Sequence, residues 1–124
     1  MKKEVLEKTL AYIPKDFDGV ILDLRSNLDG EFKNAQVDTL KDVDGTIPQF
    51  DNSVDIVFCK KLHKIKNTKK ALEEISRVLK DGGKLVACLK PYDSFRSDLK
   101  DIFNVNSYHT MGHYAYFEAE KRSS

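Results

Sequence analysis

The sequence predicts an α/β fold built on a mostly parallel sheet, and three observations within residues 50–91 carry that prediction. Residues 54–59 form a short, nearly continuous apolar run, which is typical of a parallel strand covered on both faces. Apolar residues then recur at helical spacing from Ala71 to Leu79, and residues 84–89 form a second apolar run. Strand, helix and strand in this order make one βαβ unit, whose right-handed connection places the helix on one face of the sheet.

Glycine and proline mark the ends of these elements. We expect the helix to end at Asp81-Gly82-Gly83, because glycine adopts the left-handed conformation of a helix C-terminus at little steric cost. Pro91 ends the second strand because it has no backbone donor for the ladder. A second amphipathic helix then carries Phe95, Leu99, Ile102 and Phe103. Two β-rich runs follow around Met111-Gly112, at residues 105–110 and 113–120.

The N-terminal half is shorter than such a fold usually requires. Residues 3–13 form an amphipathic helix that Pro14 ends, and residues 19–24 are the first strand. Only about 30 residues separate Leu24 from Val54, which is the length of one βαβ unit. We therefore expect a single short strand at residues 35–37, and a helix after the first strand that is missing or reduced to one turn.

Composition favours one compact, soluble domain spanning residues 1–124. A net charge of +1 gives no global field that would attract nucleic acid or an anionic membrane. The apolar runs are far too short to span a membrane, and the N-terminus lacks the apolar core of a secretory signal. Cys59 and Cys88 lie in two strand candidates and are expected to be buried, reduced thiols, so we expect a cytoplasmic protein.

Part of the chain resembles a known family. The segments DNSVDIVF, LHKI and ALEEISRVLKDGGKLV, in this order and spacing, resemble the second half of class I S-adenosylmethionine-dependent methyltransferases, most closely the small-molecule-type group. The resemblance covers roughly residues 46–91. It implies a Rossmann-like methyltransferase fold, here truncated in its first half, whose sheet is closed by an antiparallel C-terminal strand pair. It also implies S-adenosylmethionine as the cofactor.

The turn after the first strand departs from the family pattern. In the family this strand leads into a glycine-rich turn of the form D-x-G-x-G-x-G, whose glycines let the backbone approach the cofactor closely. Here Asp23 is followed by arginine and asparagine at the first two glycine positions, Arg25 and Asn27, and Gly30 stands one residue out of register. An arginine side chain at this place fills space that the cofactor occupies. The departure predicts weak or lost cofactor binding.

The resemblance implies a set of cofactor-binding positions: Asp23, Asn27, Asp38, Asp44, Phe58, Cys59 and His63. An acidic residue after the second strand accepts hydrogen bonds from the ribose hydroxyls in the family, and Asp38 matches it by position; the alternative is a solvated turn residue. Another acidic residue meets the adenine amino group, and Asp42 and Asp44 both lie one position out of register with it. Asp44-Gly45 is equally a plain turn signal, so this choice stays open.

The segment from Lys60 to Lys70 holds six lysines in eleven residues and follows a strand, where ligands bind in open α/β sheets. One interpretation of this segment is a rim that faces an anion, such as a phosphorylated substrate, an RNA or an acidic partner. The alternative interpretation is a solvated loop. His63 is read either as a base or as a structural hydrogen-bonding residue. Asn67 or Thr68 is expected to cap the next helix.

No catalytic constellation can be assigned, so the catalytic residues stay unknown. Methyl transfer depends largely on positioning a nucleophile in line with the sulfonium methyl group, which requires no fixed set of side chains. His109 and His113 are four residues apart, but on a hairpin this spacing does not place them on one face, and we expect no metal site.

Three functions remain. The first is an S-adenosylmethionine-dependent methyltransferase-family domain with weak or lost cofactor binding, acting on a small or phosphorylated substrate. The second is a non-catalytic methyltransferase-like domain that binds a protein, similar to the shortened N-terminal domain of anamorsin-type iron–sulfur assembly proteins, whose cysteine tail is absent here. The third, an RNA-associated module, ranks last because no motif supplies an aromatic stacking platform. We therefore expect a small-molecule or protein partner, with no nucleic acid and no membrane; the methyl acceptor and the oligomeric state stay open.

Overall fold

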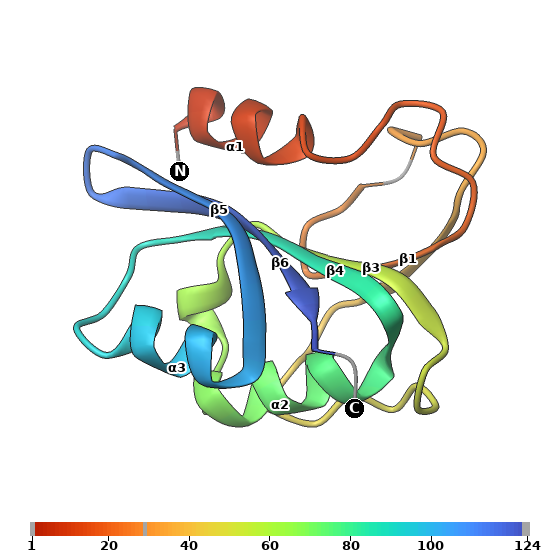
Figure 1. Cartoon of the computed structure of the whole chain (residues 1–124). Coiled ribbons are helices and arrows are strands. Elements are labelled where there is room, and N and C mark those ends of the chain that lie inside the picture. The colour runs from red at the N-terminus through yellow and green to blue at the C-terminus, as the bar shows by residue number, and fades with distance from the viewer. Residues whose placement is uncertain (1, 29, 123–124) are drawn as a thin grey trace.

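One six-stranded sheet organises the computed structural model, in the order β2-β1-β3-β4-β6-β5 (Figure 1). The structure describes residues 2–28 and 30–122. The strands are β1 (Val20–Leu24), β2 (Gln36–Leu40), β3 (Val54–Cys59), β4 (Leu79–Leu89), β5 (Phe103–Met111) and β6 (Tyr114–Lys121). The first four are parallel, and β6 runs antiparallel to both β4 and β5. The predicted mostly parallel sheet with an antiparallel C-terminal pair is thus confirmed.

Helices cover both faces of this sheet. Helix α1 (Lys3–Leu10) lies on one face, and α2 (Thr68–Val78) and α3 (Phe95–Ile102) lie on the other (Figure 1). A short 3₁₀ helix, η1 (Leu62–Lys64), connects β3 to α2. Each face has its own buried apolar cluster. The larger one contains the buried residues of α2 and α3, and the smaller one contains Ile13, Leu28 and Phe32.

The central βαβ unit forms as predicted, except at the end of its helix. The apolar stripe of α2 is fully buried and consists of Ala71, Leu72, Ile75 and Val78. The helix ends at Val78, and Leu79 is already extended and pairs with Val54 of β3. The pairing then moves to Ile56 with Lys84, which leaves an irregular stretch of β4 that contains Gly82 at a φ of +79°. The expected glycine helix end is therefore wrong, because burial and pairing of Leu79 end the helix earlier.

The N-terminal half is shortened as predicted. Among the described residues between β1 and β3, β2 is the one regular element. Strand β2 is longer than expected and runs to Leu40, since it pairs with β1 over its whole length. Val20 pairs with Gln36 at one end, and Leu24 pairs with Leu40 at the other. Helix α1 ends at Leu10 rather than at residue 13, and Ile13 is buried in the turn that follows.

Arg77 of α2 fastens the loop before β3. Its guanidinium donates to Glu74 Oε2 (2.7 Å) and Asp51 Oδ1 (2.6 Å), and to the carbonyl oxygens of Ile47 (2.6 Å) and Gln49 (3.0 Å). The hydrogen bond from Arg77 holds the pKa of Glu74 below its usual range. The network therefore ties this irregular loop to α2.

This network predicts a specific acid sensitivity. A depressed pKa in the folded state stabilises the protein above the unfolded-state pKa of about 4.3, and this contribution is lost as the pH falls through the lower folded pKa. Glu74→Gln is expected to lower the free energy of unfolding at neutral pH by about 1 kcal/mol and to make its loss in acid less steep. Urea unfolding across this pH range measures both effects. Glu73→Gln, an exposed neighbour on the same helix, is the control and should retain the wild-type profile.

Candidate functional site

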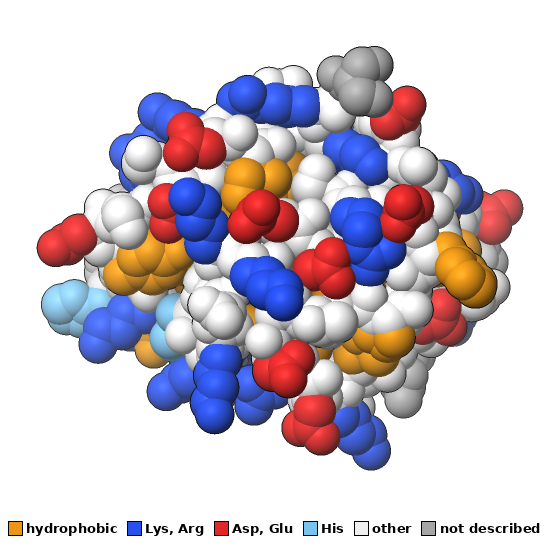
Figure 2. Space-filling view, turned by 90° about the horizontal axis from the view of Figure 1, so that it is seen from below, with side chains coloured by type: hydrophobic (Ala, Val, Ile, Leu, Met, Phe, Trp, Pro, Cys, Tyr) orange, Lys and Arg blue, Asp and Glu red, His pale blue; other side chains and the backbone are white. Residues whose placement is uncertain are grey.

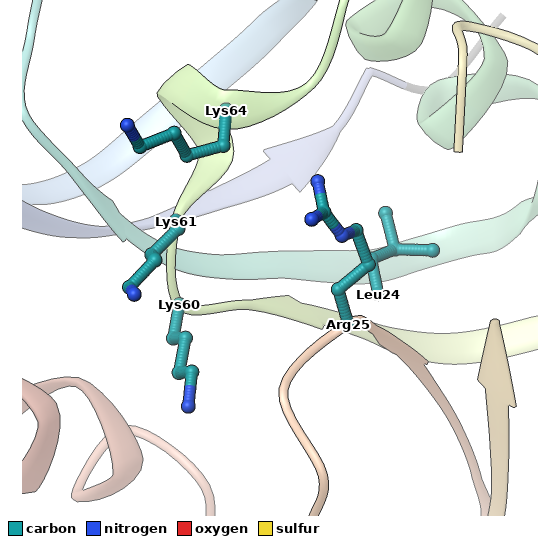
Figure 3. A pocket seen from close by; sticks show the side chains of 5 residues that line it. All are labelled: Leu24, Arg25, Lys60, Lys61 and Lys64. Carbon is teal, nitrogen blue, oxygen red and sulfur yellow. The ribbon is translucent and has the colours of Figure 1, made fainter. Parts of the chain in front are cut away.

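A cleft of about 360 Å³ opens beyond the carboxyl ends of β1 and β3 (Figure 3). It is lined by Leu24, Arg25, Lys60, Lys61 and Lys64. From β1 the chain continues to β2 on one side, whereas β3 pairs with β1 on the other side, so the strand order reverses at this point. Ligands of open α/β sheets bind at such a switch point. The position of the cleft therefore makes it the candidate site.

Asp23, the last but one residue of β1, shapes the turn that borders the cleft. Its side chain is completely buried, and its two carboxylate oxygens accept hydrogen bonds from the backbone N–H groups of Ser26 (2.8 Å) and Leu28 (2.9 Å). The Thr39 hydroxyl donates a third bond of 3.3 Å. The carboxylate thus satisfies the backbone of its own turn, and this accounts for an aspartate that is buried without an ion pair to any described basic residue.

The two glycine positions of the family pattern keep a left-handed backbone although neither holds glycine. Arg25 has a φ of +62° and Asn27 a φ of +57°. This conformation costs a residue with a β-carbon about 1–2 kcal/mol, and asparagine tolerates it better than arginine. The Arg25 N–H donates to the Leu40 carbonyl oxygen at 2.9 Å, which fixes the turn against the end of β2. The third glycine position, Asp29, lies outside the described residues.

Ser26 joins this turn to the end of β3. The side chain is buried, and its hydroxyl donates to the Leu24 carbonyl oxygen (3.1 Å) and accepts from the Lys60 N–H (2.9 Å). These bonds fix the backbone of Arg25 relative to that of the lysine segment. Sequence reasoning missed Ser26, and its place as the middle residue between the two glycine positions was the available signal.

The cleft is cationic on both sides. Arg25 follows β1 on one side, and Lys60, Lys61 and Lys64 follow β3 on the other (Figure 3). Within the described part of the chain, none of these four side chains forms an ion pair. Two carboxylates lie close by, because Asp42 and Asp44 line an adjoining hollow together with Arg25, Lys64 and Lys66. The local charge is therefore positive at the cleft and mixed beside it.

Other predicted site residues take different places. Asp38 lies in the middle of β2, paired with Leu22, rather than after the strand. It lines a separate hollow with Pro48 and Phe50, so the structure does not bring it to the cleft. Asn27 lines a small hollow beside the cleft together with Arg25, Thr39 and Lys41. Asp44 stands in the mixed-charge hollow described above.

Phe58, Cys59 and His63 have structural contacts. Phe58 and Cys59 are buried in the two apolar clusters on opposite faces of the sheet. Burial raises the pKa of the Cys59 thiol to about 12. His63 Nδ1 accepts a hydrogen bond of 2.9 Å from the Lys90 N–H, which ties η1 to the end of β4. Burial and the neighbouring lysines lower the pKa of His63, so this ring is neutral at pH 7 and suited to that bond.

The predicted cap, Asn67, stands at the N-cap position of α2 with a φ of +56°, but its side chain makes no capping bond. Thr68 instead donates its hydroxyl to the Ile65 carbonyl oxygen at 3.0 Å.

In the described ranges, no three histidine, cysteine or acidic side chains gather as metal ligands would. His109 stacks on Tyr116 at a ring distance of 5.3 Å. No helix of the described chain is long and apolar enough to cross a membrane.

The sheet order, the helices on both faces and the cleft at the switch point define a Rossmann-like α/β domain. A family model described as "Methyltransferase domain" matches residues 9–87, and the chain belongs to this family. An uncharacterized protein of Methanocaldococcus jannaschii is 35% identical over 92 residues, which are 74% of this chain and 40% of that protein. The match thus covers less than half of this curated relative.

Solved structures agree in fold. A S-adenosylmethionine-dependent methyltransferase from Aquifex aeolicus superposes with a TM-score of 0.68 at 20% identity, over 94% of this chain and 89% of that one. A chain from the complex of the Haloferax volcanii Trm112 methyltransferase activator with a protein described as a methyltransferase gives a TM-score of 0.73. Its identity is 14%, over 96% of this chain and 89% of that one. At such identities the likeness shows the fold alone.

Proposed function

We propose that this chain is a single methyltransferase-family domain that binds S-adenosylmethionine weakly or has lost it. The observation that carries this proposal is Arg25, which lines the cleft at a position where the family pattern has glycine and adopts the backbone conformation that glycine favours. The turn thus has the backbone conformation that a glycine would adopt there, while a long cationic side chain lines the cleft beside it. We expect the domain in the cytoplasm, in keeping with its two buried, reduced cysteines.

Charge supports weak binding of the cofactor. S-adenosylmethionine carries a positive sulfonium and a positive ammonium group against one carboxylate, so its net charge is positive, and four cations line this cleft. Two like charges about 4 Å apart repel by ~1 kcal/mol in bulk water and by ~4 kcal/mol at the effective dielectric constant near a protein surface. A single arginine or lysine at contact distance from the sulfonium is thus enough to weaken binding by about fivefold to nearly a thousandfold.

Hydrogen-bonding groups for the adenosyl moiety are also scarce. The carboxylate of Asp23 is occupied by its own turn, and Asp38 stands at another hollow. Phe58 and Cys59 belong to the core. Asn27 and Asp44 are the members of the predicted set that border the cleft region, and we propose them as the contacts of any residual cofactor.

Calorimetric titration of the purified protein with S-adenosylmethionine and with S-adenosylhomocysteine tests this proposal. We expect no saturable heat below millimolar ligand for either compound. The second compound lacks the sulfonium charge, so a clear preference for it would attribute the weakness to charge rather than to space. Micromolar binding of both would contradict the proposal and leave an ordinary methyltransferase.

A second candidate, a protein-interaction domain, is favoured by one exposed aromatic residue. Phe50 is 87% exposed, and with Val20, Pro48 and Val54 it lines a hollow of about 340 Å³ near the sheet edge formed by β2. The Haloferax neighbour was solved in complex with a protein activator. If this surface binds a protein, a purified partner should lose at least tenfold in affinity with Phe50→Ser and keep it with Tyr92→Ser, another exposed aromatic position. Equal affinity of the partner for the wild type and for Phe50→Ser would contradict a protein-binding role of this surface.

A further inference from the structure

We propose that the cleft between β1 and β3 binds a small molecule that carries two phosphate groups. This inference rests on the proposed function, because a cleft that holds S-adenosylmethionine tightly would have no room for such a ligand. Its basis is the placement of four cations that form no ion pair with any described residue, around one concave site at the switch point of the sheet: Arg25, Lys60, Lys61 and Lys64.

Hydrogen bonds fix the backbone that carries these cations before any ligand arrives. The Arg25 N–H is bonded to Leu40, and the Lys60 N–H is bonded to the buried Ser26 hydroxyl. The Lys64 N–H donates to the Lys61 carbonyl oxygen at 2.9 Å, which closes the turn of η1. Because these backbone segments are already ordered, binding costs less backbone conformational entropy than it would in a flexible loop. Arginine also matches the geometry of phosphate oxygens with two parallel N–H donors.

The arrangement is unfavourable without an anion. Arg25 occupies a strained left-handed conformation, and Lys60, Lys61 and Lys64 line the same cleft without an ion-paired acidic side chain among the described residues. Strained backbone of this kind persists where the surrounding structure fixes it, and it gathers at functional sites such as ligand clamps. The surface elsewhere is different: on the face that carries α2 and α3, basic and acidic side chains are intermingled (Figure 2). The cleft is thus a local feature rather than part of a uniformly basic surface.

Charge matching and size indicate the class of ligand. A phosphate monoester carries about 1.5 to 2 negative charges at neutral pH, so two such groups balance four cations. A volume of about 360 Å³ suits a small molecule. Asp42 and Asp44 limit the positive region on the side of Arg25, and they would repel a polyanion that extended past the cleft.

An RNA fits less well. The described residues include two exposed large hydrophobic side chains, Phe50 and Tyr92. Phe50 lies at the separate hollow near β2, and Tyr92 is bonded to Asp98 and packed edge-on against Phe95. Neither offers a free aromatic face at the cleft on which a base would stack. A net charge of +1 also gives no extended track for a nucleic-acid backbone.

Inorganic pyrophosphate is the probe that tests this inference, titrated calorimetrically into the full chain at an ionic strength of ~0.15 M. We expect saturable binding that weakens about tenfold or more in Arg25→Gln and in Lys61→Gln, because each removes one charge-assisted bond. Arg25→Gln keeps a side chain with a β-carbon at this left-handed position, and Lys61→Gln changes an exposed side chain, so both variants should fold as the wild type does. Lys69→Gln removes an exposed charge from the same lysine-rich segment but outside the cleft lining, and it should bind as the wild type does.

Absence of saturable binding at millimolar pyrophosphate would overturn the inference, as would an equal loss in Lys69→Gln. A single-stranded RNA that binds far more tightly than pyrophosphate would also overturn it and favour a nucleic-acid partner. These outcomes are separate from those of the cofactor titration. If neither pyrophosphate nor S-adenosylmethionine binds, the inference fails and the proposed function stands. Micromolar S-adenosylmethionine binding, in contrast, contradicts the proposed function directly.

Discussion

Replacing Asp23 by alanine is expected to lower the free energy of unfolding by about 2–4 kcal/mol. The substitution leaves the N–H groups of Ser26 and Leu28 without their acceptor in a buried turn, and each such group costs about 1–3 kcal/mol. It also frees the Thr39 hydroxyl. Urea unfolding followed by circular dichroism measures the loss. Because the turn carries Arg25, pyrophosphate binding should weaken in the same variant.

Asp38→Ala is the matched control, since this aspartate lies on the neighbouring strand and makes only long contacts of 3.3–3.4 Å to Gln36. We expect its effect to stay within about 0.5 kcal/mol. If Asp23→Ala were no more destabilising than Asp38→Ala, the turn would be held by other contacts. The explanation of the buried carboxylate given above would then fail.

Replacing Arg25 by glycine is expected to change stability and ligand preference together. Glycine adopts the φ of +62° without strain, so the free energy of unfolding should rise by about 1 kcal/mol. Removal of the guanidinium should also raise the affinity for S-adenosylhomocysteine at least tenfold, because space opens in front of the turn. Thermal unfolding and calorimetric titration of the same preparation measure the two effects.

Asn27→Gly separates the effect of backbone strain from the effect of the arginine side chain. It relieves a similar backbone conformation two residues further along but removes no charge and no long side chain. We expect a gain of a few tenths of a kcal/mol in stability and no gain in affinity for S-adenosylhomocysteine, because the variant also removes a proposed cofactor contact. Equal gains in affinity from the two glycine variants would show that backbone geometry, rather than the arginine side chain, limits cofactor binding.

Much of the fold could be predicted from local sequence patterns. The bounds of β3 follow from a continuous apolar run, and the buried stripe of α2 follows from helical spacing. Errors occurred where partners distant in sequence decide the outcome. Leu79 leaves the helix because it pairs with Val54, and β2 extends to Leu40 because β1 pairs with it over five residues. Local propensity carries no information about either pairing.

The candidate site was predictable in its charge and not in its geometry. The lysine-rich segment and Arg25 are visible in the sequence, and the expectation that ligand chemistry lies after β3 rests on a general rule for such sheets. That Ser26 bonds to Lys60, and that His63 bonds to Lys90, depends on side chains brought together from separate segments. Asp38 was assigned to the site because it follows the predicted strand at residues 35–37. Strand β2 instead runs to Leu40, so Asp38 lies in its middle and lines another hollow.

The most direct test of a cationic cleft in place of a cofactor pocket is an amide NMR titration of the wild-type protein, with pyrophosphate and S-adenosylhomocysteine added to separate samples. Pyrophosphate should shift the resonances of Arg25, Lys60, Lys61 and Lys64 in a saturable manner, while S-adenosylhomocysteine at the same concentration leaves them unchanged. Saturation of the turn at residues 24–28 by micromolar S-adenosylhomocysteine, without a response to pyrophosphate, would contradict the account.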